Sequence, residues 1–173
     1  MPSGFTFAVV DPLVAFHRDF SLRVTVVRAE RLRSATGPVT AALRDAALGP
    51  LLRRCGDALG VAPRSGLTVR LSDDEELARL NAGFLDVAGA TDVLAFPAEE
   101  PGYVGDIVIS VERALGQAPG GDGAAELRLL AVHGLLHCLG HDHALAAGAA
   151  RMTELTRELL PEQDVPALVP AGT

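Results

Sequence analysis

The sequence contains few cysteines and no long apolar segment. Its two cysteines, Cys55 and Cys138, are too few for the disulfide framework of a small secreted domain. No apolar run approaches the roughly 20 residues that a membrane-spanning helix requires. The N-terminus has no basic segment followed by a long apolar one, so we expect no signal peptide. Together these absences predict a cytoplasmic protein with no membrane partner.

Lysine and tryptophan are absent, and aromatic residues make up 4% of the chain. The 15 basic residues are all arginines, against 22 acidic residues, which gives a formal net charge of −7. Non-specific nucleic-acid binding depends on neutralising phosphates, so this balance argues against a protein that coats nucleic acid, and we expect no DNA partner. It allows an enzyme with a local arginine patch. Ordinary solvated surface is the favoured interpretation of the two arginine clusters, which are Arg23, Arg28, Arg31 and Arg33, and Arg44, Arg53 and Arg54.

The length of 173 residues suits one domain, and the hydrophobic content of 49% is enough for a sizeable core. We predict an N-terminal extension over residues 1–20, a single domain over 21–161 and a C-terminal tail over 162–173.

Hydrophobic periodicity and turn residues predict an α+β fold. Segments rich in β-formers predict strands over 22–27, 67–71, 93–96 and 104–111, the last two joined as a hairpin through Pro101-Gly102. Apolar residues at helical spacing predict helices over 38–60, 72–84, 126–139 and 145–160. The second of these helices begins with a capping box, Ser72-Asp-Asp-Glu75. The hairpin puts an antiparallel pair into an otherwise crossover-connected sheet, so we expect a mixed sheet packed with helices.

Four of the five histidines lie within the eleven residues from His133 to His143. His133 and His137 are four apart in an apolar segment predicted to be helical, which places both on one face of the helix. Two neutral imidazoles so placed can bind one divalent metal, at Zn–N distances of about 2.0–2.1 Å. The sequence therefore predicts a metal-binding helix.

A third ligand requires the chain to turn. In a continuous helix, His133 and His141 would lie about 12 Å apart along the axis, at about 1.5 Å per residue, and could not reach the same ion. Gly140 can end the helix because glycine adopts the left-handed conformation. After that turn, His141 or His143 can swing back to the metal, and the spacing does not choose between them.

The pattern His-x-x-x-His-x-x-Gly-x-x-His resembles that of the metzincin zinc proteases. Metzincins have a glutamate after the first histidine, which acts as general base, and here that position is Gly134. General bases typically contribute about 10²–10⁴-fold to a rate. We therefore expect the metal site without the proteolytic chemistry, and a metzincin-like zinc hydrolase or protease is the alternative hypothesis.

Three blocks in the same order resemble the YbeY family of bacterial rRNA-maturation endoribonucleases, over roughly residues 22 to 160. The first is Leu80-Asn81 followed by Thr91-Asp92-Val93-Leu94-Ala95-Phe96-Pro97, and the second is Gly105-Asp106-Ile107-Val108-Ile109-Ser110. The third is His133-Gly134-Leu-Leu-His137-Cys-Leu-Gly140-His141-Asp142-His143, in which His141 replaces a usual aromatic residue.

This resemblance implies a zincin-like fold and a metal-dependent hydrolase domain over 21–161. It implies one Zn²⁺ held by His133, His137 and His143, with His141 outside the site. The implied activity is single-strand-specific cleavage of rRNA, in maturation of the 3′ end of the small-subunit rRNA and in ribosome quality control. The implied partners are rRNA and the small ribosomal subunit with its proteins. A further alternative is a non-catalytic, metal-stabilised ribosome-assembly factor, in which His141 would also coordinate the ion.

The family usually has an arginine at the position of Leu85, where it would be expected to contact phosphate. Leucine cannot do this. Either another arginine substitutes, Arg79 being the nearest in sequence, or RNA binding is weaker or differently built.

Other polar residues near the motif have two possible roles each, and no catalytic residue is assigned. Asp142 either orients a ligand imidazole or caps the final helix. Asp92 and Asp106 either support the metal site or are turn residues. Cys138 is expected to be a core thiol rather than a ligand, because adjacent helical residues point about 100° apart.

Overall fold

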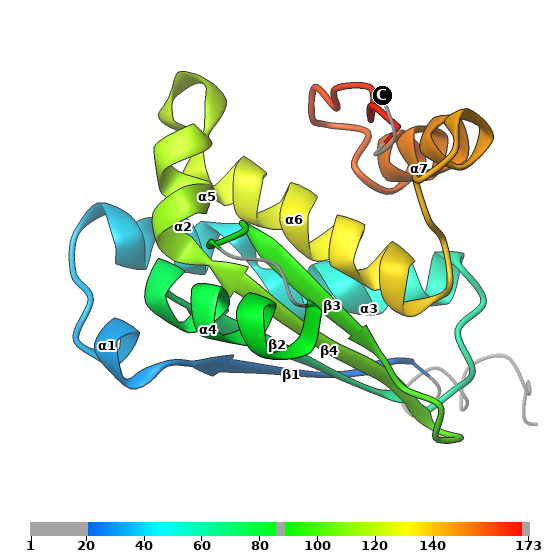
Figure 1. The fold of residues 1–173 in the computed structure, drawn as a ribbon, viewed down its shortest axis with the longest axis horizontal. Helices are drawn as coiled ribbons and strands as arrows, with labels where there is room; N and C mark the ends of the chain where they lie inside the picture. The colour runs from blue at the N-terminus through cyan, green and yellow to red at the C-terminus, as the bar shows by residue number, and fades with distance from the viewer. Residues whose placement is uncertain (1–20, 86–88, 171–173) are drawn as a thin grey trace, which may run out of the picture.

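The computed structural model describes residues 21–85 and 89–170. Its centre is a mixed four-stranded sheet in the order β1-β2-β4-β3 (Figure 1). Strands β1 (Arg23–Arg28), β2 (Gly66–Ser72) and β4 (Tyr103–Ser110) are parallel, while β3 (Val93–Pro97) pairs antiparallel with β4. The predicted α+β class, the mixed sheet and the hairpin are therefore confirmed.

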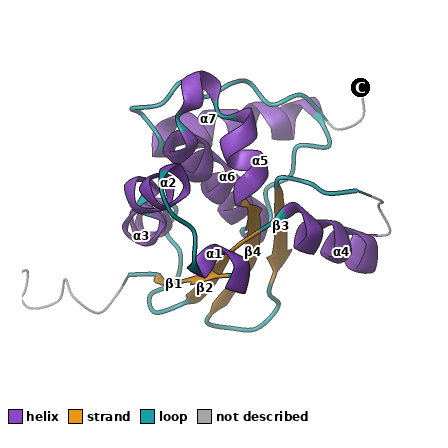
Figure 2. Ribbon diagram, turned by 90° about the vertical axis from the view of Figure 1, so that its left-hand side faces the viewer, coloured by secondary structure: helices purple, strands orange, loops and turns teal. Residues whose placement is uncertain are grey.

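Helices cover the two faces of this sheet unequally (Figure 2). Helices α2 (Pro38–Ala46), α3 (Leu48–Ala58) and α6 (Gly123–Cys138) lie on one face, which we call the covered face. Helix α4 (Asp74–Leu85) lies on the opposite face, where Leu77 packs on Leu94 and Val108. The remaining helical segments are α1 (Glu30–Arg33), α5 (Val111–Gln117), the short 3₁₀ turn η1 (Pro119–Gly121) and α7 (Ala146–Leu159).

The predicted helix over 38–60 is wrong in one respect, because it is two helices. Ala47 adopts the left-handed conformation, with φ of 45°, and separates α2 from α3. Pro50 accounts for the break, since in a continuous helix its ring would clash with the carbonyl of Ala46.

The capping box at the start of α4 is also wrong in its details. The Glu76 amide donates to the Asp73 carboxylate at 2.9 Å, so Asp73 caps the helix. The Ser72 hydroxyl, assigned that role from the sequence, instead donates to the Glu76 carboxylate. Helices α1 and α5 were not predicted at all.

The core lies mainly between the covered face and α6. Five strand side chains on this face are at most 2% exposed: Leu67, Val69, Leu71, Ile107 and Ile109. Helix α6 contacts the sheet on one side and α2, α5 and α7 on others, which explains its almost continuously apolar sequence. The predicted metal helix is therefore a central element of the fold.

The C-terminal residues that the structure describes pack against the helices. Val165 is 5% exposed, and its carbonyl accepts hydrogen bonds from the Arg157 guanidinium. The Leu168 amide donates to the Thr153 hydroxyl at 3.0 Å. None of the helices in ranges 21–85 and 89–170 is long and apolar enough to span a membrane.

Candidate metal centre

Helix α6 carries His133 and His137 on one face, as their spacing predicts. The Asp122 carboxylate caps the helix, accepting a hydrogen bond from the Ala125 amide at 2.9 Å. Gly134 faces the sheet, and a Cβ there would lie 2.7 Å from Ile107 Cγ2. The residue beside the first histidine is therefore glycine for a packing reason, because any side chain would push α6 away from β4.

Gly140 ends the helix and reverses the chain, as predicted. Its φ is 86°, and its amide donates to the His137 carbonyl at 2.9 Å. The His141 amide donates to the Leu136 carbonyl at 3.0 Å. These two bonds form a Schellman motif, in which glycine takes the left-handed position at no steric cost.

The turn after Gly140 is held by Asp142, in a role that neither sequence alternative describes. Its carboxylate accepts hydrogen bonds from the amides of His143 at 2.7 Å and Ala144 at 3.2 Å. It therefore fixes the backbone that carries His143, rather than binding an imidazole or capping α7. Gly148 lets α7 approach this turn, since a Cβ there would overlap the Asp142 carbonyl oxygen. The sequence pattern did not point to Gly148.

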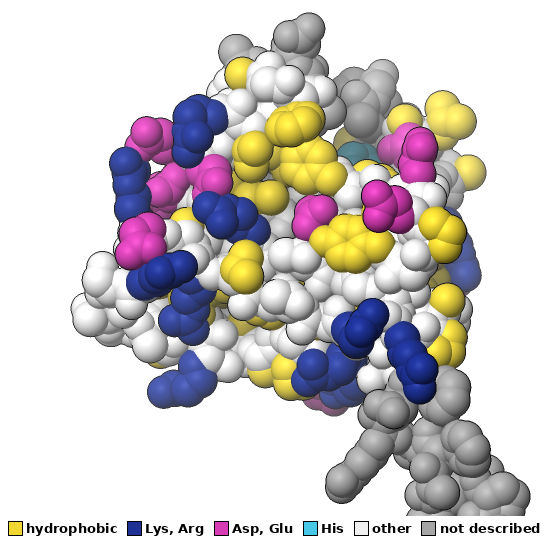
Figure 3. Space-filling view, turned by 90° about the horizontal axis from the view of Figure 1, so that it is seen from below, with side chains coloured by type: hydrophobic (Ala, Val, Ile, Leu, Met, Phe, Trp, Pro, Cys, Tyr) yellow, Lys and Arg dark blue, Asp and Glu magenta, His cyan; other side chains and the backbone are white. Residues whose placement is uncertain are grey.

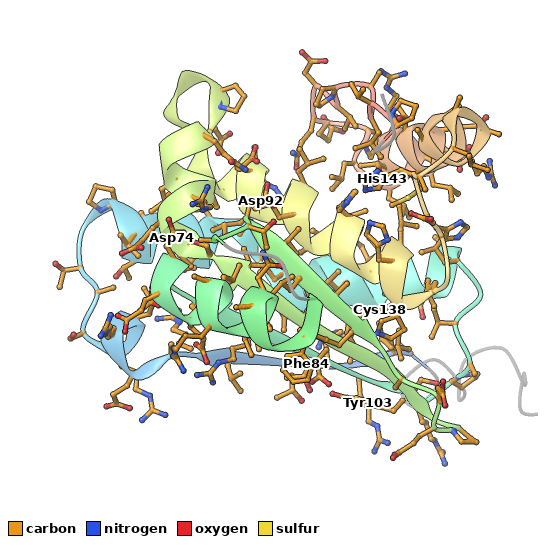
Figure 4. All side chains as sticks on the ribbon, in the orientation of Figure 1. Asp74, Phe84, Asp92, Tyr103, Cys138 and His143 are labelled. Atoms are coloured by element: carbon orange, nitrogen blue, oxygen red, sulfur yellow. The ribbon has the colours of Figure 1, made fainter. Side chains whose placement is uncertain are left out.

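The turn brings His143 to the two helical histidines. One possible ligand nitrogen from each of His133, His137 and His143 lies within 4.8 Å of the others. The Nε2 atoms of His133 and His137 are 3.1 Å apart, and the ring centroids are 4.6 to 5.2 Å apart. Figure 4 shows the labelled His143 beside the upper side of α6, next to the start of α7.

This arrangement fits a divalent metal. Two imidazole nitrogens at about 2.0–2.1 Å from one tetrahedral ion lie roughly 3.3–3.4 Å apart, close to the separation in the structure. His143 Nδ1 is buried and has no hydrogen-bond partner among the residues described. A buried nitrogen without a partner is costly, and a ligand site removes that cost at this cluster.

The protonation of the cluster also suits metal binding. Burial lowers the pKa of His133 to about 4, and the imidazoles of His137 and His143 act in the same direction. Burial, followed by His143, also lowers the pKa of His137. Both imidazoles are therefore neutral near physiological pH, which is the form that coordinates a metal.

His141 and Cys138 lie outside this cluster. Together with Leu139 they line a cavity of about 500 Å³ at the end of α6. Cys138 is 8% exposed, and burial raises the pKa of its thiol to about 12. A buried, protonated thiol behaves as a small apolar side chain, in agreement with the expected core role.

Asp92 is connected to α6 through a glutamine that the sequence pattern did not single out. The Gln117 side-chain amide donates to Asp92 at 3.2 Å and to Glu126 at 2.7 Å. Asp92 also accepts from the Val93 amide at 2.9 Å, and its charge partly offsets the lowering of the His133 pKa by burial and the other two imidazoles. Asp92 therefore both closes a turn and influences the cluster electrostatically.

Asp106 contributes no group to the cluster, and the Leu85 position cannot be compared because its side chain lies outside those described. The Asp106 carboxylate accepts from the Tyr103 hydroxyl at 2.7 Å, on the opposite face of the sheet. Leu85 is the last residue of α4, and its side chain is outside those that the structure describes.

Known proteins are similar in sequence to most of this chain. The family model described as Endoribonuclease YbeY matches residues 39–164. Endoribonuclease YbeY from Gloeobacter violaceus is 43% identical over 122 residues, which are 61% of this chain and 63% of that protein. The chain thus matches less than two thirds of that relative's length. Endoribonuclease YbeY from Thermobifida fusca is 40% identical over 126 residues, which are 65% of this chain and 81% of that protein.

Among solved structures, the solution structure of TM1509 from Thermotoga maritima aligns with 82% of this chain and 90% of that one. Its TM-score is 0.48 and its sequence identity is 22%. The family match begins later than the resemblance estimated from the sequence motifs and extends slightly beyond it. It includes the hairpin, the metal helix and the turn after Gly140. The chain belongs to the YbeY family.

Proposed function

We propose that this chain is a zinc-dependent endoribonuclease that cleaves single-stranded segments of rRNA during maturation of the 3′ end of the small-subunit rRNA. One Zn²⁺ per chain would be held by His133, His137 and His143. The observation that carries the proposal is the convergence of these three imidazoles, with no fourth His, Cys, Asp or Glu of the described residues in the group. Three protein ligands with one position left open are typical of catalytic zinc sites, whereas structural sites usually have four.

The chain's own residues fix the positions of the three histidines and keep His133 and His137 neutral. The Gly134–Ile107 contact fixes α6 on the sheet, and the Gly140 turn with Asp142 fixes His143. His133 and His137 stay neutral because burial lowers their pKa values. A bound divalent ion would supply Lewis-acid polarisation of a phosphoryl oxygen.

The attacking group is either water or the neighbouring 2′-hydroxyl of the RNA, and the two routes leave different products. Attack by the 2′-hydroxyl leaves a 2′,3′-cyclic phosphate, whereas attack by water leaves a linear phosphate. Two carboxylates near the histidine cluster already accept hydrogen bonds, Asp92 from Gln117 and Asp142 from backbone amides. We therefore assign neither as the general base of either route. Analysis of the product ends identifies the route.

The alternative hypotheses have less support. A metzincin-like protease needs a glutamate beside the first histidine, and position 134 has no room even for a Cβ. A structural metal site would gain support from a fourth ligand at His141, which instead lies with the cavity at the end of α6. The family membership of the chain further favours the nuclease.

RNA cleavage by matched histidine variants tests the proposal. We expect wild type and His141→Ala to cut a small-subunit rRNA fragment, with cleavage abolished by a chelator and restored by Zn²⁺. His137→Ala should be inactive on the same fragment. The same extent of RNA cleavage by wild type and His137→Ala would contradict the nuclease assignment. Metal-dependent cleavage of an unstructured peptide would favour the protease.

The proposal also implies partners and a location. An enzyme acting on rRNA during assembly would meet the small ribosomal subunit and its proteins, in the cytoplasm, and would contribute to ribosome quality control. Co-sedimentation of the full chain with small subunits, compared with large subunits, measures this association.

A further inference from the structure

The aromatic side chains of the described ranges all lie on one side of the sheet. Phe84, Phe96 and Tyr103 are the phenylalanine and tyrosine residues within 21–85 and 89–170, and the buried core contains none of them. Phe84 is 69% exposed, and its ring meets Phe96 edge-on with centroids 5.3 Å apart. Phe96 and Tyr103 are half-buried, so no phenylalanine or tyrosine of the described ranges is fully buried, although such residues usually bury large areas.

Strand register places these rings opposite the covered face. Thr68, Asp106 and Phe96 are direct neighbours across β2, β4 and β3, so their side chains share one face. Tyr103 reaches the same row, because its hydroxyl bonds both Thr68 and Asp106 at 2.7 Å. In Figure 4 the labelled Phe84 lies under α4 and the labelled Tyr103 beside the lower end of β4, whereas His143 lies above α6. We call the surface formed by Phe84, Phe96 and Tyr103 the aromatic face.

The Tyr103 ring is held against the sheet. A Cβ on Gly66 would lie 2.8 Å from Tyr103 Cδ2, so the ring occupies the space above that glycine. With its hydroxyl fixed by two hydrogen bonds, the ring cannot rotate freely. A ligand that stacks on it therefore loses little additional side-chain entropy.

Arginines border the aromatic face, although acidic groups are also present. Arg23 is exposed at the start of β1, and the register places it on the same face as Thr25 and Thr68. Its Nε donates to the Arg64 carbonyl at 2.9 Å. Arg70 of β2 pairs with Glu76 at 2.9 Å, and Asp106 is engaged by Tyr103. Figure 3, seen from below, shows hydrophobic side chains gathered among arginines with some acidic groups. Both acids named here thus already have partners, while Arg23 makes no ion pair in the described ranges.

We propose that the aromatic face binds single-stranded RNA by base stacking, with Arg23 contacting its phosphates. The inference rests on the proposed function. It identifies a second surface, outside the metal site, that contacts the same RNA. The exposed Phe84 ring and the half-buried rings of Phe96 and Tyr103, with Arg23 at the border, provide both contacts that single-stranded nucleic acid uses. Strand β3 lies at the edge of the sheet between this face and α6, so an RNA crossing β3 reaches both the rings and the histidine cluster.

Fluorescence anisotropy on the metal-loaded full chain tests the proposal. The probe is a labelled, single-stranded 2′-O-methyl RNA, which lacks the free 2′-hydroxyl. We expect Phe84→Ala to raise Kd by about five- to tenfold, the lower end of the measured range for loss of base stacking. Phe84→Trp should preserve the wild-type Kd. The matched control is Val169→Ala, which removes an equally exposed apolar side chain, 71% exposed, from the C-terminal segment.

Salt dependence separates stacking from phosphate contact. Arg23→Gln should flatten the plot of log K against log salt by about 0.7, the value for one phosphate contact on a single strand. Phe84→Ala should weaken binding without changing that slope. A structural defect would not produce this division between the two variants.

The proposal is overturned if Phe84→Ala and Val169→Ala bind RNA equally well. It is also overturned if Phe84→Ala changes the sedimentation of the protein alone, because the face would then mediate self-association. Failure of the nuclease assignment is a separate result, seen as loss of metal-dependent cleavage while the Phe84 variants still differ in RNA binding.

Discussion

The covered face of the sheet and the aromatic face differ in the side chains that they present. The covered face is aliphatic and buried where α6 packs on it, and Ile107 and Ile109 there are 0% exposed. On the aromatic face, the Phe84 ring is 69% exposed, whereas the rings of Phe96 and Tyr103 are half-buried. The comparison indicates that the two faces have different roles. The covered face stabilises the fold and fixes the metal helix, while the aromatic face remains available for a ligand.

Truncating one side chain on each face should give the largest difference in unfolding free energy between the two faces. Ile107→Ala removes a fully buried side chain beneath Gly134 and should cost about 2–5 kcal/mol of unfolding free energy. Phe84→Ala removes a mostly exposed ring and should change stability by less than about 0.5 kcal/mol. Urea denaturation of both variants measures the contrast, and similar losses would show that the aromatic face is part of the core.

Adding a methyl group at Gly134 should disturb the covered face without touching a histidine. The new Cβ would lie 2.7 Å from Ile107 Cγ2, so we expect Gly134→Ala to destabilise the protein by about 1–3 kcal/mol. Gly116→Ala is the matched control, because it lies in α5 and a Cβ there would meet no atom within 4 Å. That substitution should stabilise the protein by up to about 1 kcal/mol, through helix propensity. Thermal unfolding of the two variants should therefore shift in opposite directions, and a shift in the same direction would contradict the packing argument.

Acid should destabilise the metal-free chain through His133. The unfolded chain takes up a proton below pH 6.5, whereas in the folded state the pKa of His133 is lowered to about 4. This contribution to stability is therefore complete above pH 6.5 and is lost as the pH falls toward 4. Each proton bound only by the unfolded state gives a slope of at most about 1.4 kcal/mol per pH unit.

Urea midpoints of the chelator-treated chain between pH 7 and pH 4 measure this loss. His133→Leu removes the titrating group, so its stability should fall less steeply over the same interval. Identical profiles for the two proteins would mean that burial does not keep His133 neutral.

Introducing an arginine at position 85 should have the smallest effect, a modest rise in RNA affinity. Leu85→Arg at the end of α4 adds one charge that can contact phosphate, and we expect RNA affinity to rise by a few fold. Leu85→Gln is the uncharged control. Anisotropy at two salt concentrations should show a steeper salt dependence for the arginine variant, and an unchanged slope would exclude a new phosphate contact.

Local sequence signals identified most of the elements that build the candidate site. The spacing of His133 and His137 and the helix-ending Gly140 predicted a helix, a turn and a returning ligand, because each depends on only a few neighbouring residues. The choice of His143 over His141 came from family resemblance, and the structure brings His143 to the other two. The hairpin followed from β-rich segments on either side of Pro101-Gly102.

The features that sequence reasoning missed depend on tertiary contacts. Gly134 is explained by Ile107, 27 positions earlier, and Gly148 by the backbone of Asp142. Gln117 joins Asp92 to Glu126 across two elements. The break at Ala47 is different, since Pro50 offered a local signal for it. The position of the aromatic residues on one face required the strand register, which periodicity alone does not provide.

Metal content after equilibrium dialysis against Zn²⁺ tests the central claim most directly, using His141→Ala and His143→Ala. The two histidines are two residues apart, yet only His143 belongs to the cluster. Losing a hydrogen-bonded neighbour of a ligand already costs about 10–100-fold in metal affinity, so losing a ligand should cost more. We predict one ion per chain for wild type and His141→Ala, and almost none for His143→Ala. Retention of the ion by His143→Ala, or its loss from His141→Ala, would contradict the account.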